Sequence, residues 1–327
     1  MKNIIKIFIL TATPIVFTIV LFLSGEFIMR YVYTPLKDGL EEISNFKYMP
    51  EASQISFRNG KYIDDKRPGS FRILVLGDSF SWGVCVKNAT DIWPSRLQEI
   101  LISEAKRDIE VVNMGLPTFT TVNEWELLNK EGWYLNPDLI VLQFTLNDPL
   151  PSGKNYVCVN NLEKVLGIKD LIPFKKLNFY LKQNSYFYMY VNGKYQDLQR
   201  AIFHPTYYKE LYKEDYQGWI NCKAAFATIA KEAYDKNVKV VFVIFPVFER
   251  GVHTREKYAY SDIHDKVASI AKRCGFYVID LLDTFVREGK DFSYWHAHKF
   301  DHHPNEKAHD LTAQEVAACI IENRLIK

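Results

Sequence analysis

The cysteines of this sequence are few and are not spaced as metal or redox sites require. The chain has five, Cys85, Cys158, Cys222, Cys274 and Cys319, and no two of them form a Cys-x-x-Cys pair. This argues against a zinc site or a dithiol redox site built from them. Because the count is odd, at least one thiol has no partner inside the molecule.

A strong charge of either sign is also missing. The 41 Lys and Arg residues nearly balance the 39 Asp and Glu residues, so the net charge is +2. No basic stripe stands out along the chain, and we therefore expect neither a nucleic-acid partner nor a polyanionic one. Internal repeats and low-complexity tracts are absent too. The 327 residues, 48% of them hydrophobic, can bury the core of one large domain with attachments.

One long run without charge is present, at the N-terminus. It extends from Ile7 to Gly25, close to the ~20 residues that an α-helix needs to cross the core of a bilayer. A cleaved signal peptide is the alternative, but its apolar region is normally shorter and no small-x-small cleavage site is evident near residues 22–26. We therefore expect a transmembrane anchor in residues 1–30.

The charges that flank this run predict its orientation. Lys2 and Lys6 precede it, so the positive-inside rule places the N-terminus in the cytoplasm and everything after Glu26 outside it. Residues 31–68 then form a polar connector, which leaves residues 69–327 for the main domain.

Strand and helix patterns alternate through that domain. Apolar runs bounded by turn residues indicate strands, and apolar residues at helical spacing indicate helices. Because most of the strands are apolar nearly throughout, they favour a parallel sheet covered on both faces. The expected strands are 73–76, 109–113, 139–144, 240–245 and 276–280, and the expected helices are 92–106, 123–131, 219–235, 261–273 and one after residue 305.

A small hydroxyl residue follows the first strand. The apolar run ends at Gly77, and Asp78 and Ser79 come next. Open α/β sheets keep their reactive groups at the carboxyl ends of their strands, so Ser79 is the candidate nucleophile. The alternative is that Asp78 or Ser79 only caps the next helix, since both residue types are favoured there.

Residues 149–218 break the alternation of strands and helices. This segment contains ten of the 20 tyrosines. It follows the third strand, where a lid or a substrate-binding subdomain is expected. The alternative is that the tyrosines pack a small core of the insert's own. We place this Tyr-rich insert at about 150–217.

Four short blocks together resemble those of the SGNH, or GDSL, hydrolases. They are Gly-Asp-Ser-Phe at 77–80, Asn-Met-Gly at 113–115, Thr-Leu-Asn-Asp at 145–148 and Asp-His-His-Pro-Asn at 301–305, in the order and approximate spacing of that family. The resemblance covers residues 69–327 apart from the insert. It implies a three-layer α/β/α flavodoxin-like fold with a central parallel five-stranded sheet, and a serine hydrolase without a cofactor.

The resemblance also implies a role for each matching residue. Ser79 resembles the nucleophile, His303 the general base and Asp301 the group that orients that base. The backbone N–H groups of Ser79 and Gly115 and the side-chain amide of Asn147 resemble the oxyanion hole. The chemistry agrees, because these three are neutral donors that can be held rigidly, and the loss of one such donor costs ~10²–10³ in turnover.

The sequence departs from the family pattern at two places. Thr145 stands two residues before the asparagine, where the family usually has glycine. Only His302 separates Asp301 from His303, where two residues commonly lie between the acid and the histidine. The adjacent histidines leave two candidates for the base, and we favour His303 because it directly precedes the Pro-Asn of the block.

Two further sets of residues invite a function. Most of the eight histidines lie between His296 and His309, and with Asp301 they could ligate a metal ion. A hydrolytic metal site would leave the serine and the oxyanion donors without a role, so we expect no metal. Trp82 and Trp295 lie close in sequence to the blocks and are candidates for stacking on sugar rings, although tryptophan more often packs in a core.

Together these patterns predict a membrane-anchored serine esterase with its catalytic domain outside the cytoplasm. The expected substrate carries O-acyl groups, acetyl first of all, on a cell-envelope polysaccharide; this choice rests on location and analogy. A lipid esterase and an O-acyltransferase would use the same residues. The contrasting class is an idle carbohydrate-binding or assembly module, against which four chemically matched groups argue.

Overall fold

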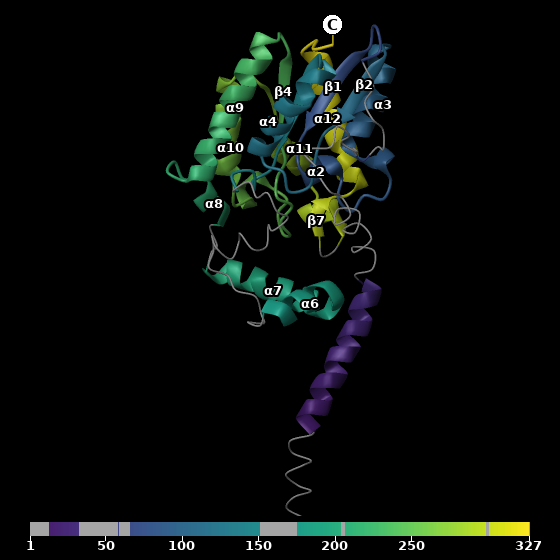
Figure 1. Ribbon diagram of the computed structural model, residues 1–327, viewed down its shortest axis with the longest axis vertical. Coiled ribbons are helices and arrows are strands. Elements are labelled where there is room, and N and C mark those ends of the chain that lie inside the picture. Colours follow the sequence, from purple (N-terminus) through teal and green to yellow (C-terminus); the bar gives the residue numbers. More distant parts are fainter. Residues whose placement is uncertain are drawn as a thin grey trace, which may run out of the picture. The chain divides into compact units, whose positions relative to one another are not determined.

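The computed structural model describes residues 13–32, 58, 66–150, 175–203, 207–298 and 301–326 (Figure 1). The chain divides into two compact units. The anchor unit comprises Met1–Asp38 and Val157–Pro205, and the sheet unit comprises Gly39–Tyr156 and Thr206–Lys327. Cys158, residues 151–174 of the predicted insert, and the predicted connector apart from residues 31–32, 58 and 66–68 lie outside the described residues.

The sheet unit is built on five parallel strands in the order β2-β1-β3-β4-β5. Every residue of β1 and β3 is buried, because central parallel strands are covered on both faces. The order and direction of the strands confirm the predicted flavodoxin-like fold. The bounds are β1 (Phe71–Leu76), β2 (Ile109–Asn113), β3 (Leu139–Phe144), β4 (Lys239–Ile244) and β5 (Tyr277–Asp280).

Helices cover both faces of this sheet. Connections between parallel strands are right-handed. The connection from β1 to β2 runs in one direction along the sheet and the later connections, from β2 to β3, β3 to β4 and β4 to β5, run in the other, so the two sets of helices lie on opposite faces. Accordingly α3 packs against α12 on one face, and α4 packs against α9 on the other (Figure 1). The bounds are α3 (Trp93–Ala105), α4 (Thr121–Lys130), α9 (Gln217–Asp235), α10 (Ser261–Arg273) and α12 (Glu306–Glu322).

Several short elements were not predicted from the sequence. The most important is an antiparallel pair, β6 with β7, that comes just before α12. The pair contains few apolar residues, so no strand pattern marks it. The short elements are α2 (Ser79–Trp82), α8 (Tyr207–Leu211), α11 (Leu281–Arg287), β6 (His296–His298), β7 (Asp301–Pro304) and the 3₁₀ turns Ala89–Asp91, Gly132–Leu135, Arg255–Lys257 and Phe292–Trp295.

The described part of the anchor unit is three helices. The N-terminal helix, Thr13–Val32, is long and apolar enough to cross a membrane, and its most apolar window is not buried. A signal sequence has the same properties, and the direction of insertion stays a prediction. The insert contributes α6 (Lys175–Asn184) and α7 (Tyr186–Phe203), which pack on each other.

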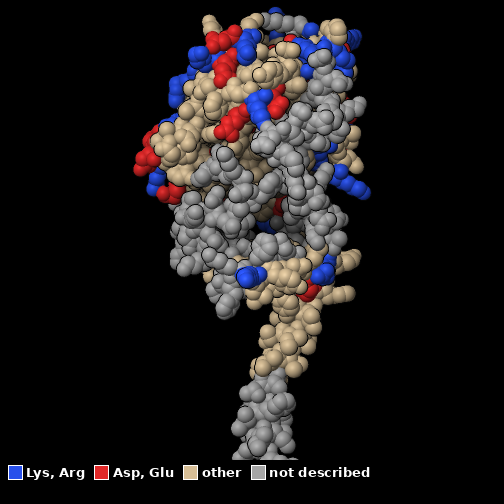
Figure 2. Space-filling model, viewed as in Figure 1, with Lys and Arg blue, Asp and Glu red and all other residues tan. Residues whose placement is uncertain are grey.

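Charged side chains of both signs are interspersed on the face of the sheet unit that Figure 2 shows. This mixed surface is consistent with the nearly balanced composition. The described residues on that face do not form the continuous positive surface that would attract a polyanion. The described part of the N-terminal helix is largely uncharged in the same view.

Candidate active site

The strand β1 delivers Ser79 to the carboxyl edge of the sheet through a tight turn. Asp78 caps α2 by accepting a hydrogen bond from the N–H of Phe80 at 2.8 Å. Gln143, the only polar residue of β3, accepts hydrogen bonds from the N–H of Asp78 and from the hydroxyl of Ser81. A Cβ at Gly77 would lie 2.4 Å from the Gln143 Oε1 atom, so only glycine fits there. The turn is thus fixed from both sides.

A hydrogen-bonded chain joins Ser79 to His303 and Asp301. The Ser79 Oγ atom lies 2.9 Å from His303 Nε2, and His303 Nδ1 lies 2.6 Å from Asp301 Oδ1. Asp301 Oδ1 also accepts the backbone N–H of His303 at 2.8 Å. The single intervening residue is therefore no obstacle, because the carboxylate reaches both the backbone and the ring of the residue two positions on.

The neighbouring histidine points elsewhere. Successive side chains of a strand lie on opposite sides, and in β7 the ring of His302 stacks on His296 with 4.5 Å between the ring centroids. The ring of His303 lies 5.3 Å from that of Phe80 instead. Of the two histidines, the structure brings only His303 to the serine hydroxyl.

The charges of Asp301 and His303 stabilise each other. Burial alone would raise the pKa of Asp301, but the charge and the two hydrogen bonds of His303 outweigh it and lower this pKa to about 2. For His303, burial favours the neutral ring, yet the adjacent Asp301 carboxylate raises its pKa above the usual value. A carboxylate fixed beside Nδ1 leaves Nε2 as the atom that faces the serine proton.

The predicted oxyanion donors lie on β2 and β3 loops of the same edge. The Thr145 hydroxyl lies within hydrogen-bond distance of Asn147 Oδ1 and of Asp78 Oδ2. Because the oxygen of the Asn147 side chain faces Thr145, its amide nitrogen is turned away from Thr145. The N–H of Gly115 donates to Asn113 Oδ1 at 3.0 Å. A Cβ at Gly115 would lie 2.5 Å from that of Ser81, so glycine is required for this close approach to α2. Ser79 begins α2, where backbone N–H groups lack an intrahelical acceptor.

A family model described as GDSL-like lipase/acylhydrolase matches residues 75–311. The chain belongs to this family. The assignment confirms the predicted family and the predicted enzyme class of the domain, an ester hydrolase.

Other proteins are similar over part or all of this GDSL domain. An arylesterase of Vibrio mimicus is 34% identical over 102 residues, which are 31% of this chain and 50% of the arylesterase. The chain thus spans about half the length of that curated relative. Among solved structures, TesA has 15% identity and a TM-score of 0.46, with 78% of this chain and 99% of TesA covered. The acetyl xylan esterase AlAXEase has 15% identity and a TM-score of 0.44, with 76% and 100% covered.

Beside the candidate nucleophile of the GDSL domain lies a cluster of three carboxyl groups, a grouping that the sequence did not predict. Asp78, Asp148 and Glu124 are each 1% exposed. Burial raises the pKa of all three, and for Glu124 and Asp148 the neighbouring carboxyls raise it further. No Lys or Arg within the described ranges forms an ion pair with them. These acids are therefore held toward their neutral forms.

Arg58 is a second group that sequence reasoning missed. It belongs to the predicted connector, yet its guanidinium donates to the carbonyl of Trp82 at 2.8 Å and to those of Gly83 and Val86. These carbonyls lie at the last residue of α2 and in the loop after it, so Arg58 supports the segment that follows the candidate nucleophile. An isolated arginine in a polar stretch carries no sequence signal for such a contact.

The GDSL domain contains another acid–histidine pair, in which the histidine contacts a tyrosine hydroxyl instead of a serine hydroxyl. His264 Nδ1 lies 2.7 Å from Asp280 Oδ1, and its Nε2 lies 3.3 Å from the hydroxyl of Tyr258. That hydroxyl accepts the N–H of Val247, and the His264 side chain is fully buried. The pair therefore ties α10 to the ends of β4 and β5.

The remaining predicted candidates lie in the interior. Trp82 and Trp295, the predicted sugar contacts, are 4% and 5% exposed, so neither presents an open ring face to solvent. His309 is buried and its Nδ1 accepts the N–H of Trp93 at 3.1 Å. Burial lowers the pKa of His309 to about 3, which makes it a neutral packing residue between α12 and α3.

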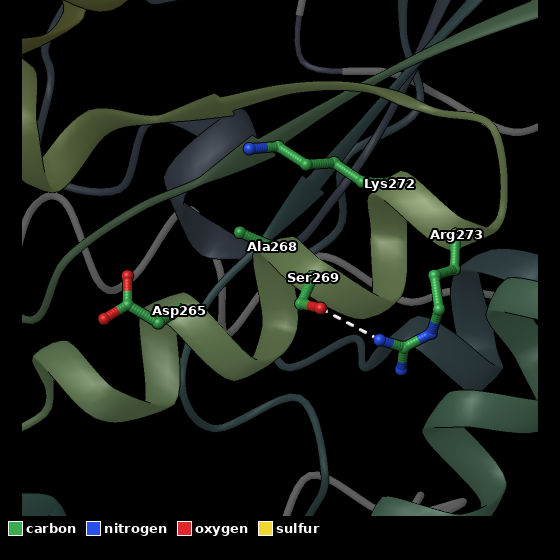
Figure 3. Close-up of a pocket in the computed structure, with 5 residues that line it drawn as sticks. All are labelled: Asp265, Ala268, Ser269, Lys272 and Arg273. Carbon is green, nitrogen blue, oxygen red and sulfur yellow. Dashed lines mark hydrogen bonds between the residues drawn. The ribbon is translucent and has the colours of Figure 1, made fainter.

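The described residues of this domain include no cluster of metal-ligating side chains. Among the described residues, no three His, Cys, Asp or Glu side chains are grouped so as to hold a metal ion. Four of the cysteines, Cys85, Cys222, Cys274 and Cys319, are free thiols. A shallow surface pocket lies along α10 (Figure 3), where Arg273 donates to Ser269. Its lining, Asp265, Ala268, Ser269, Lys272 and Arg273, includes no residue of the candidate active site.

Proposed function

We propose that this protein is a serine esterase in which Ser79 is the nucleophile, His303 the general base and Asp301 the group that orients it. The observation that carries the proposal is the continuous chain from Asp301 Oδ1 through the His303 ring to Ser79 Oγ, with 2.6 and 2.9 Å between the paired atoms. Such a serine, base and acid are the parts that ester cleavage through an acyl-enzyme requires.

The chemistry follows from this chain of contacts. Ser79 Oγ attacks the ester carbonyl carbon while its proton passes to His303 Nε2. The carbon–oxygen bond to the alcohol then breaks, and His303 returns the proton to the leaving alcohol. Water attacks the acyl-enzyme with His303 again as the base, and the carboxylic acid leaves as Ser79 regains its proton. Asp301 stabilises the imidazolium in both halves without taking the proton.

Asn147, with the N–H groups of Ser79 and Gly115, is proposed to bind the oxyanion. The contact between the Thr145 hydroxyl and the Asn147 oxygen supports this role. With the oxygen facing Thr145, the amide nitrogen of Asn147 points away from Thr145 and can donate to an oxyanion. Gly115 would have to release or share its hydrogen bond to Asn113. Donors aimed at a developing oxyanion supply a large part of the rate enhancement in acyl transfer.

For the substrate we propose an O-acyl group, acetyl first of all, on a polysaccharide outside the cytoplasm. An apolar N-terminal helix supports this choice, since with Lys2 and Lys6 before it the predicted orientation puts the sheet unit on the outer side. A lipid ester would suit the same chemistry. Transfer to a sugar hydroxyl instead of water would use the same residues.

The first test is labelling and turnover of the full chain in detergent. We expect wild type to react with a fluorophosphonate and to hydrolyse a short aryl acetate, and Ser79→Ala and His303→Ala to lose both. Ser269→Ala is the matched control, because Ser269 is an exposed serine on α10. A well-folded wild type that is neither labelled nor active would overturn the esterase assignment.

The second test addresses the substrate. We expect release of acetate from an O-acetylated polysaccharide to exceed release of fatty acid from a lipid ester, measured with the same enzyme sample. Adding an unacetylated oligosaccharide and following it by mass spectrometry separates transfer from hydrolysis. Acylated oligosaccharide as the main product would establish a transferase and contradict the hydrolytic step.

A further inference from the structure

The N-terminal helix contains an acidic residue that binds another helix of the anchor unit. The carboxylate of Glu26 accepts hydrogen bonds from Ser185 Oγ at 2.8 Å, from the N–H of Tyr186 at 3.2 Å and from the N–H of Phe187 at 3.1 Å. The two N–H groups begin α7, where they have no acceptor within the helix. A negative group is favoured at such an end by the helix dipole. Glu26 therefore caps α7 from a distant part of the chain.

Arg30, one turn further along the same helix, holds the end of α6. Its Nε lies 2.9 Å from the Glu26 carboxylate, and its Nη2 donates to the carbonyl of Asn184 at 3.3 Å. Its guanidinium lies over the ring of Tyr186, 5.0 Å from the ring centroid. The pair of charges thus binds both sides of the corner between α6 and α7.

An apolar contact beside these charges shows that the two surfaces fit closely. The rings of Phe22 and Phe187 meet edge to face with centroids 5.6 Å apart. Gly25 forms a notch for Phe187, since a Cβ there would lie 2.6 Å from that ring. A charged cap, an ion pair and a shape match along residues 22–30 form one docking surface.

The place of this docking surface on the helix matters for its surroundings. Glu26 directly follows the uncharged run that ends at Gly25. If the helix spans a bilayer, residues 26–30 lie where the apolar core gives way to head groups. Tyrosine is enriched at that level, and α6 and α7 are rich in it. The two helices also expose apolar side chains: Leu177 (47%), Tyr180 (60%), Leu198 (57%) and Ile202 (59%).

We propose that the N-terminal helix is retained in the mature protein and holds α6 and α7 on the outer surface of the membrane, where their exposed apolar side chains contact lipid. A removable signal sequence has no use for Glu26, Arg30 and Gly25 as a binding surface for a segment about 160 residues away. The inference rests on the proposed membrane location, but it does not depend on ester hydrolysis.

The test of location uses the full chain in vesicles of phosphatidylethanolamine and phosphatidylglycerol. A photoreactive phenylalanine analogue replaces Leu198 in α7 or, as the control, the 83% exposed Tyr234 in the sheet unit. We expect at least about tenfold more lipid adduct at position 198, as for a helix lying in the interface. Equal adducts at the two positions, or an intact mass showing that the mature chain lacks residues 13–26, would overturn the proposal.

The test of docking compares two leucine substitutions in adjacent positions. Gly25→Leu fills the notch for Phe187, whereas Ser24→Leu adds the same side chain at an exposed position. Overpacking of this kind destabilises the contact, so we expect trypsin to cut after the exposed Lys194 about tenfold faster in Gly25→Leu. Ser24→Leu should match wild type.

Equal cleavage of Gly25→Leu and wild type would contradict the docking surface. Fluorophosphonate labelling of Ser79 is measured on the same samples to separate this inference from the proposed function. A chain that is not labelled yet gives the lipid adduct at position 198 refutes the esterase and supports the membrane surface. A chain that is labelled at Ser79 but gives no excess of lipid adduct at position 198 refutes only the proposed contact of α6 and α7 with the membrane.

Discussion

The carboxyl groups on the two sides of Ser79 contrast in how they carry charge. On one side Asp301 has a histidine on its oxygen, and this partner lowers its pKa to about 2. On the other side Asp78, Asp148 and Glu124 face one another, and burial raises the pKa of each. The charged form of a buried carboxyl is favoured where a neighbouring cation and hydrogen bonds outweigh burial, and the neutral form is favoured where burial and nearby carboxyls outweigh the hydrogen bonds.

The hydrogen bonds of Thr145 show how the neutral side serves the site. Its single hydroxyl lies within bonding distance of Asp78 Oδ2 (2.7 Å), Asp148 Oδ1 (3.0 Å) and Asn147 Oδ1. A threonine hydroxyl has one proton to donate and two lone pairs to accept with. If that proton goes to Asn147, whose oxygen can only accept, a protonated carboxyl must supply each of the other two bonds. In the proposed mechanism, Asp301 thus prepares the base and Thr145 orients a donor.

The largest expected effect comes from removing the charge of Asp301. Asp301→Asn should lower kcat/KM by ~10⁴, because the amide favours the wrong tautomer of the histidine. His303 must be neutral to accept the serine proton, so activity is lost as the pH falls through its pKa. Asp301 raises that pKa, and its removal should move the acid limb of the pH–rate profile to lower pH.

Asp280→Asn is the matched control for this change, because Asp280 is paired with a different buried histidine, His264. We expect it to lower Tm while leaving the acid limb of the folded enzyme where wild type has it. An acid limb that shifts equally in both variants would show that His303 is not the titrating base.

The second effect tests the donor itself. Asn147→Ala should lower kcat by ~10²–10³ with a smaller change in KM, as for the loss of one oxyanion donor. Steady-state kinetics on the aryl acetate measure both constants. Unchanged turnover would remove Asn147 from the oxyanion site and leave the backbone N–H groups of Ser79 and Gly115 as the only donors proposed.

A third and smaller effect tests the link between the neutral carboxyls and Asn147. Thr145→Val keeps the shape of the side chain but removes the hydroxyl that orients the amide. Because one hydrogen bond contributes about 1 kcal/mol, we expect this loss to lower kcat several-fold. Thr145→Ser retains the hydroxyl and should stay near wild type. If Ser and Val behave alike, the hydroxyl has no part in positioning Asn147.

The two sides of the site also differ in how far the sequence predicts them. Ser79 and Asn147 stand in short local blocks that follow apolar strands, and Asp301 and His303 stand in a third block just before α12. The order of these blocks along the chain predicts all four residues as site candidates. The strands themselves were predicted to within two residues at each end, since parallel buried strands are marked by uninterrupted apolar runs.

Glu124, Arg58 and the pair of strands β6 and β7 carry no such local signal. Glu124 lies in an amphipathic helix, where a glutamate is ordinarily solvated, and only the packing of α4 on α9 buries it. Arg58 is one arginine in a polar stretch, and β6 and β7 are too short and too polar to show a strand period. Each of these depends on contacts between residues far apart in the sequence, which periodicity does not report.

The smallest expected effect is on stability, and it tests by its pH dependence whether Glu124 differs from Asp301 in how it carries charge. The raised pKa of Glu124 means that the native state resists ionisation of this residue. Its ionisation therefore does not lower the free energy of unfolding at a pH below its unfolded pKa of ~4.3, and lowers it increasingly as the pH rises above that value. Glu124→Gln cannot ionise. Its free energy of unfolding relative to wild type should therefore increase by about 1 kcal/mol or more between pH 5 and pH 8. Glu126→Gln, an exposed position of the same helix, should show no such trend in urea unfolding. A flat difference for both variants would mean that water or a cation reaches Glu124, and the contrast with Asp301 would then be one of degree only.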